Sequence, residues 1–380
     1  MDAKDLPDFV VSTSTMPGVG DAEVTDDERA TARIICHGLF GSLAGYKGFP
    51  ETGLSDEPAI PAKVGSFRIF EYGMPASQQP YKVDGDTLTR ARLSALYTQD
   101  RAGQLRGKHS MVVAVSSTIS AASNKVALDD KPMCENERIV LYVSGGGFVM
   151  SDSPQSKWMY IRLSQELGMR AFVPRYHVAP RYVYPRPLHD VYTAYQHLVS
   201  RGFRPQDILM IGASAGANIC LSVLQLLGAE GKLSSVAGCV ICEPCLDLTM
   251  SHASWQSNQD VCVLPYVPST DPGSFSRIYL GPINDDDDDV EGNADIAEVL
   301  RRPLISPMFA DVTVLPPMQI QVGEDDVLRD ETKAFAARIP TAELITYAGI
   351  NHYTLFRGRT QLDRLYGNAR KFADKVFGGN

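Results

Sequence analysis

Residues 208–218, Ile-Leu-Met-Ile-Gly-Ala-Ser-Ala-Gly-Ala-Asn, constrain the fold more than any other part of the chain. Four consecutive apolar residues predict a buried strand, and the residues after the serine are compatible with a helix. Gly212 and Gly216 lie two residues to either side of Ser214, and they lack the Cβ atoms that would clash in a tight turn. The pattern predicts a strand, a sharp turn and a helix, with Ser214 as a candidate nucleophile. The G-x-S-x-G pattern is short, so this assignment depends on partner residues elsewhere in the chain.

Composition and charge exclude several classes of partner. A chain of 380 residues that is 44% hydrophobic is long enough for one large domain with a cap. Its net charge of -9 opposes binding to the phosphate backbone of nucleic acids. Residues 1–20 lack the basic and apolar regions of a signal peptide, and no run of about 18 apolar residues follows. We therefore expect a cytoplasmic protein with no membrane span and no nucleic-acid partner.

Seven cysteines are an odd number, which is unlike the disulfide framework of small secreted domains, so we expect reduced thiols. Three of them form a C-x-x-C-x-x-C pattern at Cys239, Cys242 and Cys245. The first two lie in an apolar run at residues 236–242 that predicts a central strand. Residues three apart on a strand point to opposite faces of the sheet, so these thiols should not converge. We expect no metal site at this pattern.

Strands and helices alternate from residue 111 onward. Strands are expected at residues 111–115, 138–143, 170–173, 208–211, 236–242, 314–322 and 344–347. Helices are expected at residues 158–167, around 188–198, from the serine turn through 224, and at 363–377. This alternation predicts an α/β fold with a mostly parallel central sheet flanked by helices.

The chain divides by pattern into two regions. Residues 1–105 mix glycines, prolines and charges without regular alternation, which predicts an N-terminal cap. Residues 106–380 are expected to form one catalytic domain around Ser214, with a possible second cap segment within residues 246–303. An acidic run at residues 285–289 is interpreted as a solvated loop, because consecutive carboxylates lack the alternating ligand positions of calcium loops.

A serine hydroxyl is a weak nucleophile at neutral pH unless a histidine takes its proton and a carboxylate orients that histidine. Where such a serine lies on a turn between a strand and a helix, both partners are expected to follow it in the chain. Two histidines, His252 and His352, come after Ser214. His352 lies between a predicted strand and the terminal helix, and we interpret it as the base. His252 lies in a polar segment, where a solvent-facing or lid histidine is expected.

Several carboxylates directly follow the late strand, in the sequence Gly-Glu-Asp-Asp-Val-Leu-Arg-Asp at residues 323–330. This position places them at the carboxyl edge of the sheet, where the sites of α/β proteins form. Asp326 is the preferred acid, and Asp325 is an open alternative. Glu324 and Asp330 are interpreted as solvated or helix-capping carboxylates.

Three consecutive glycines follow the strand predicted at residues 138–143. The sequence Ser-Gly-Gly-Gly-Phe at residues 144–148 offers backbone amides free of side chains, which predicts an oxyanion loop. A second pattern, His-Gly-Leu-Phe-Gly-Ser at residues 37–42, is similar to the H-G-x-x-G loop of other hydrolases. It precedes the α/β alternation, so we set it aside.

Over residues 138–377 these segments together resemble the hormone-sensitive-lipase-like branch of the α/β-hydrolases, which carries an H-G-G-G motif and a G-x-S-A-G turn. Further similar segments are Tyr-His-Val-Ala-Pro at residues 176–180, the Pro and Asp at 187–190, Glu-Pro-Cys-Leu-Asp at 243–247 and Ile-Ser-Pro at 305–307. The resemblance implies a serine carboxylesterase that needs no cofactor. It also implies a triad of Ser214, Asp326 and His352, with the backbone amides of Gly146, Gly147 and Ala215 as the oxyanion hole.

Two features depart from the pattern of that family. Ser144 replaces the motif histidine, and alanines at 213 and 217 flank the serine turn. The principal hypothesis is hydrolysis of a small-molecule ester or lactone through an acyl-enzyme. Ser144 and the unusual cap motivate an alternative in natural-product biosynthesis, by lactone opening, acyl transfer or cyclisation. A noncatalytic receptor, as in the gibberellin receptors, is a third hypothesis, although those receptors lack the triad histidine that is present here as His352. The sequence leaves the oligomeric state open.

Overall fold

The computed structural model describes most of the chain after residue 136 and three strands before it. The described residues are 63–64, 67–73, 111–116, 137–149, 154–174, 176–179, 182–231, 236–271, 273–281, 296–313, 315–352 and 359–378. Most of the predicted N-terminal cap, the acidic run at 285–289 and the pattern at 37–42 therefore lie outside the described residues.

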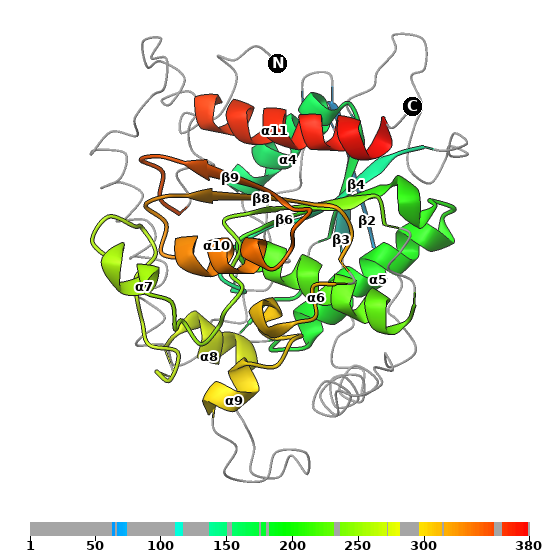
Figure 1. The fold of residues 1–380 in the computed structure, drawn as a ribbon. Coiled ribbons are helices and arrows are strands. Elements are labelled where there is room, and N and C mark those ends of the chain that lie inside the picture. Colours follow the sequence, from blue (N-terminus) through cyan, green and yellow to red (C-terminus); the bar gives the residue numbers. More distant parts are fainter. Residues whose placement is uncertain are drawn as a thin grey trace, which may run out of the picture.

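The described strands form one nine-stranded sheet in the order β1-β2-β3-β5-β4-β6-β7-β8-β9 (Figure 1). The strands are β1 Lys63–Val64, β2 Phe67–Gly73, β3 Met111–Ser116, β4 Ile139–Val143, β5 Arg170–Pro174, β6 Ile208–Ala213, β7 Gly238–Cys242, β8 Met318–Gly323 and β9 Glu343–Tyr347. From β5 to β9 neighbouring strands pair in parallel, whereas β1, β2 and β3 pair antiparallel. The predicted mostly parallel sheet is confirmed.

Helices cover both faces of this sheet. The elements are α4 Pro154–Leu167, α5 Arg186–Ser200, α6 Ala215–Ala229, α7 Ser254–Ser257, α8 Phe275–Leu280, α9 Ile296–Leu300, α10 Arg329–Ala337 and α11 Arg359–Phe377, with 3-10 turns at Pro205–Asp207 and Pro307–Phe309. Helices α4 and α11 lie over one face, and α5, α6 and α10 lie under the other (Figure 1). Every residue of β4 through β8 is buried, as expected for parallel strands covered on both sides.

Cys239 and Cys242 lie on opposite faces of the sheet. Cys239 packs in the core beneath α5 and α6, and Cys242 packs in the core beneath α4 and α11. Burial raises the pKa of Cys239 to about 12 and raises the pKa of Cys242 well above its usual value. Metal binding requires the thiolate, so both the geometry and the raised pKa values disfavour a metal at the C-x-x-C-x-x-C pattern.

Strands β1 and β2 belong to the sequence stretch interpreted as the N-terminal cap. They extend the edge of the sheet, because Arg68 of β2 pairs with Ser116 of β3, and β3 continues against β5. Part of this stretch therefore adds to the sheet. The domain boundary at residue 105 stays a prediction.

Candidate active site

Ser214 occupies the sharp turn between β6 and α6. Its backbone has φ 51° and ψ −121°, a left-handed conformation that is uncommon outside glycine and costs about 1–3 kcal/mol. Backbone hydrogen bonds hold the turn: the Ser214 amide donates to the Cys242 carbonyl over 2.9 Å, and the Ala217 amide donates to the Ser214 carbonyl over 3.0 Å. The predicted unit of strand, turn and helix is confirmed, and it presents a partly exposed serine at the carboxyl edge of the sheet.

The two glycines of this turn are required by close backbone approaches. A Cβ atom on Gly212 would lie 2.6 Å from the Ala217 Cα atom, where α6 leaves the turn. A Cβ atom on Gly216 would lie 2.2 Å from the Val143 carbonyl oxygen at the end of β4. Any side chain at either position would push the first turn of α6 away from the sheet.

His352 lies between Ser214 and Asp326. Its Nε2 atom is 3.0 Å from the Ser214 Oγ atom, and its Nδ1 atom is 3.0 Å from the Asp326 Oδ2 atom. His352 is 6% exposed and Asp326 is fully buried. Ser214 follows β6, Asp326 follows β8 and His352 follows β9. The carboxyl edge of the sheet therefore brings together side chains from distant parts of the sequence.

Asp326 is fixed by its own loop and by a neighbouring segment. Its Oδ1 atom accepts a hydrogen bond from the Leu328 amide over 3.0 Å, and its carbonyl accepts one from the Asn258 side chain over 2.8 Å. The Cys262 sulfur lies 3.9 Å from Oδ1. One carboxylate oxygen is thus held by the loop while the other faces His352.

The neighbouring carboxylates occupy other positions. Asp325 is partly exposed, and its backbone amide donates to the Ile350 carbonyl over 2.9 Å. Glu324 pairs with Lys333 and Asp330 pairs with Arg329. Of the two acids left open by the sequence, Asp326 is the one whose carboxylate contacts the imidazole.

The charges around His352 favour its protonated form more than water favours that of a free histidine. Burial is the largest influence and lowers the pKa of His352. Asp326 opposes it through its charge and hydrogen bond, and Glu243 adds a further opposing charge. Together they raise the pKa of His352 above its usual value of 6.5.

The predicted oxyanion loop, residues 144–148, lies against the serine turn. A Cβ atom on Gly145 would be 3.1 Å from the Ser214 Cβ atom and 2.8 Å from the Ala213 carbonyl oxygen. Gly147 has φ 57°, so the loop uses conformations that suit glycine. The Tyr176 hydroxyl donates to the Ser144 carbonyl over 2.8 Å, which anchors the start of the loop.

The amides predicted as oxyanion donors all come from segments beside Ser214. Gly146 and Gly147 lie within the loop that contacts Ser214, and Ala215 is the first residue of α6. The buried Ser144 side chain stands where the resembling family has histidine. The loop therefore keeps its place next to the serine turn with a tyrosine as a support.

Sequence reasoning missed a second buried carboxylate, that of Glu243. It directly follows β7 and is fully buried, and its Oε2 atom lies 3.7 Å from the His352 Nδ1 atom. Within the described ranges, one cluster of three His, Cys, Asp or Glu side chains is tight enough to hold a metal ion. It consists of Glu243, Asp326 and His352, and one possible ligand atom from each lies within 4.8 Å of the other two. The Nδ1 atom of His352 already faces Asp326 at hydrogen-bond distance, and both carboxylates can stabilise the positive charge of the imidazole when it is protonated. An acidic residue immediately after a buried strand was the sequence signal for Glu243.

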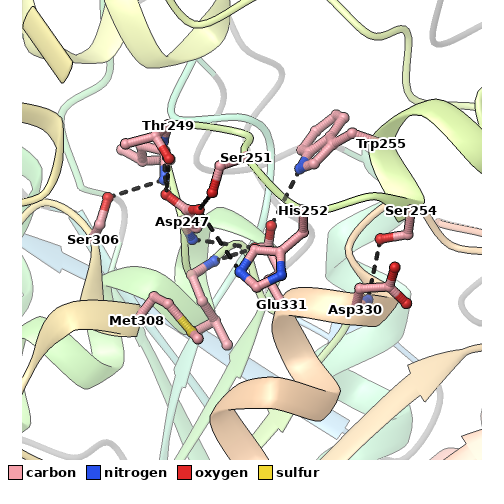
Figure 2. A network of polar contacts seen from close by, with 12 residues as sticks. Asp247, Thr249, Ser251, His252, Ser254, Trp255, Ser306, Met308, Asp330 and Glu331 are labelled. Atoms are coloured by element: carbon pink, nitrogen blue, oxygen red, sulfur yellow. Dashed lines mark hydrogen bonds and ion pairs between the residues drawn. The ribbon is translucent and has the colours of Figure 1, made fainter.

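A polar network ties the loop after β7 to α10 (Figure 2). The buried Glu331 carboxylate accepts hydrogen bonds from the Leu246 and Asp247 amides and from the Trp255 indole. Asp247 accepts from the side chains of Thr249 and Ser251. Burial raises the pKa of Glu331 well above its usual value. The network makes residues 246–255, the start of the segment at residues 246–303, a fixed part of the core.

His252 belongs to this second network rather than to the serine site. It is partly exposed, and its Nε2 atom lies 3.8 Å from the Asp247 carboxylate. Figure 2 shows it beside Asp247 and near Glu331. The structure therefore places His352, and not His252, against Ser214.

Helix α6 also holds both ends of the segment at residues 246–303. The Asn218 side chain donates to the carbonyls of Cys245 and Ile305, over 3.0 and 2.9 Å. One turn further along, the Ser222 hydroxyl donates to the Leu304 carbonyl over 3.0 Å. The helix that begins at the nucleophile thus fixes the entry and exit of this segment.

The fold and site define an α/β-hydrolase with a serine, histidine and aspartate in contact. A family model described as alpha/beta hydrolase fold matches residues 140–355, more than half of the chain, and the chain belongs to this family. This membership confirms the predicted fold and family resemblance.

Two curated relatives and one solved structure are similar to the chain. An esterase of Acinetobacter venetianus is 26% identical over 60% of this chain and 68% of its own length. An acetyl-hydrolase of Streptomyces hygroscopicus is 27% identical over 54% of this chain and 62% of its own length, so the match spans less than two thirds of that relative. A crystal structure of an esterase from the bacterial hormone-sensitive lipase family has a TM-score of 0.59 at 18% identity, covering 97% of this chain and 95% of the other. At that identity the structural likeness concerns the fold.

Among the helices in the described ranges, none combines the length and apolar character needed to cross a membrane.

Proposed function

We propose that the chain hydrolyses carboxylic esters through an acyl-enzyme formed on Ser214. The observation that carries this proposal is the continuous contact from Ser214 to His352 to Asp326, with both distances at 3.0 Å. Family membership and the relatives named esterase and acetyl-hydrolase support the reaction class. A small-molecule ester, such as an acetyl ester, is the proposed substrate.

In the proposed mechanism each of the three side chains has its own role. His352 Nε2 removes the proton from the Ser214 hydroxyl as its oxygen attacks the ester carbonyl, and Asp326 holds the Nδ1–H and stabilises the imidazolium. His352 then returns the proton to the leaving alcohol, which leaves the acyl group on Ser214. Water attacks this acyl-enzyme with His352 again as base and releases the acid.

The negative charge that develops on the carbonyl oxygen needs hydrogen-bond donors. We assign this role to the backbone amides of Gly146, Gly147 and Ala215, which come from the two segments that meet at Ser214. The close approach of Gly145 to Ser214 supports this assignment. One such donor contributes on the order of 3 kcal/mol to the transition state.

The proposed reaction needs no cofactor. Lactone opening and acyl transfer to an alcohol would use the same acyl-enzyme. Chromatographic analysis of products, with water and a primary alcohol as competing acceptors, separates these outcomes. Free acid as the main product supports hydrolysis, and an exchanged ester as the main product would assign the chain to acyl transfer.

Labelling by a fluorophosphonate tests whether Ser214 is activated. We expect stoichiometric phosphonylation at Ser214, because an activated hydroxyl attacks phosphorus as it attacks a carbonyl. Peptide mapping by mass spectrometry identifies the site, and a heat-denatured sample serves as the control. A folded protein that takes up no label would instead support a noncatalytic receptor.

The pH dependence of kcat/KM should report the ionisation of His352. The base must be neutral to accept a proton, so activity is lost as the pH falls through the pKa of His352. Because that pKa is raised, the acid limb should lie above pH 6.5. Rates with an uncharged p-nitrophenyl ester between pH 5 and 9 measure it, and a limb well below 6.5 would contradict the described surroundings of the imidazole.

A further inference from the structure

Glu243 lies between the strands that carry the nucleophile and the acid. It follows β7, which pairs with β6 on one side and β8 on the other. The Glu243 amide donates to the Gln321 carbonyl of β8 over 2.7 Å, and the preceding carbonyl, that of Cys242, accepts from the Ser214 amide over 2.9 Å. The backbone around Glu243 is thus attached to both neighbours of the site.

The Glu243 backbone adopts a conformation that glutamate rarely takes. Its φ is 46°, in the left-handed region where a side chain is strained. Residues held in such conformations by their surroundings cluster at functional sites. Here the conformation accompanies a fully buried carboxylate whose Oε2 atom faces the His352 ring at 3.7 Å.

Burying a carboxylate is costly unless charge or hydrogen bonds compensate it, and the His352 imidazole lies 3.7 Å from Glu243 on the site side. From the other elements, Asp326 contacts the same Nδ1 atom at 3.0 Å, and Ser214 contacts Nε2 at 3.0 Å. Cys262 lies against Asp326, and burial raises the pKa of its thiol, so it adds no charge near neutral pH. Two carboxylates therefore share one imidazole.

We propose that Glu243 is a positioning residue, a second carboxylate partner that holds the Nδ1 side of His352 and stabilises the positive charge on its ring. Asp326 remains the hydrogen-bonded acid, and Glu243 acts through His352 without touching the substrate. The proposal rests on the proposed function, because it concerns the step in which His352 takes the Ser214 proton. It also gives a physical role to the strained glutamate at the end of this buried strand.

Glu243→Gln tests the charge while keeping the size of the side chain. We expect kcat to fall about tenfold with KM unchanged, because the ring loses support in the transition state rather than in substrate binding. Removing a negative charge disfavours the protonated imidazole, so the acid limb of kcat/KM should move to lower pH by about one unit. An unchanged limb together with an unchanged kcat would overturn the proposal.

A double-mutant cycle with Asp326→Asn measures whether the two carboxylates support the same ring. If they do, the Glu243→Gln change should cost at least about tenfold more in the Asp326→Asn background than in the wild type, because no carboxylate then remains. Equal factors in the two backgrounds would show independent roles and would overturn the proposal.

Two controls separate this role from a structural one. Glu331→Gln alters another fully buried glutamate, and it should lower the thermal unfolding midpoint without moving the acid limb. Glu243→Asn introduces a residue that accepts left-handed backbone more easily, so it keeps the test available if the glutamine variant does not fold.

If Ser214→Ala retains wild-type activity, the proposed function fails. If only the Glu243 variants behave as wild type, this inference alone fails.

Discussion

Ser214→Ala is expected to reduce kcat/KM for p-nitrophenyl esters by roughly 10⁵- to 10⁶-fold, as for other serine hydrolases of this mechanism. The alanine has no oxygen to attack the carbonyl, and His352 at 3.0 Å loses the group whose proton it takes. Residual turnover would come from the oxyanion loop and from substrate binding. Steady-state kinetics on purified protein measure the effect. The thermal unfolding midpoint of each variant shows that it is folded at the assay temperature.

Ser222→Ala is the matched control on the same helix. Ser222 is equally small and is buried, but its hydroxyl donates to the Leu304 carbonyl and not to the site. We expect a loss of about 1 kcal/mol in stability and kcat/KM within a few fold of the wild type. Wild-type esterase activity in Ser214→Ala would remove the acyl-enzyme mechanism.

Asp326→Asn is expected to reduce kcat/KM by about 10³-fold. Asparagine cannot stabilise the imidazolium as a carboxylate does, and its amide can turn the ring into the wrong tautomer, a change that costs about 10⁴-fold where one carboxylate serves the histidine. The loss should be smaller here because Glu243 stays 3.7 Å from the Nδ1 atom. Kinetics at the pH optimum of each variant measure this difference.

Asp325→Asn is the neighbouring control. Asp325 is partly exposed, and the substitution keeps the hydrogen bond from its backbone amide to the Ile350 carbonyl. We expect kcat/KM within about threefold of the wild type, since surface substitutions of this kind change little. A large loss in Asp325→Asn with a small one in Asp326→Asn would reassign the acid.

The parts of the site that the sequence predicted have strong local signals. A run of apolar residues ending in G-x-S-x-G specifies β6, the strained turn at Ser214 and the start of α6, because few sequences tolerate those close backbone approaches. The choice between His252 and His352 followed from the regular order of elements. The choice between Asp325 and Asp326 did not follow from that order. The directions of two adjacent side chains in a loop depend on how the loop folds.

The parts that the sequence did not predict depend on long-range packing. Glu243 gave no periodic signal, and its proximity to His352 arises from the neighbouring positions of β7 and β8 in the sheet. Likewise, β2 pairs with a strand about 40 residues away, and no local pattern distinguished it from the surrounding stretch. Long-range pairing of this kind is specified by the whole sheet and not by the segment itself.

The anchoring of residues 246–303 at both ends by α6 fixes where this stretch begins and ends, independently of its length. Asn218 and Ser222 bind the carbonyls on either side of it, so its two ends meet at one helix whatever lies between them. Loop-closure entropy rises only slowly with length, so longer or shorter stretches can be grafted between these anchors at small thermodynamic cost. Any such graft has to keep Asn258, which binds the Asp326 carbonyl, and Trp255, which donates to Glu331, because the triad acid and the core beneath it depend on these contacts.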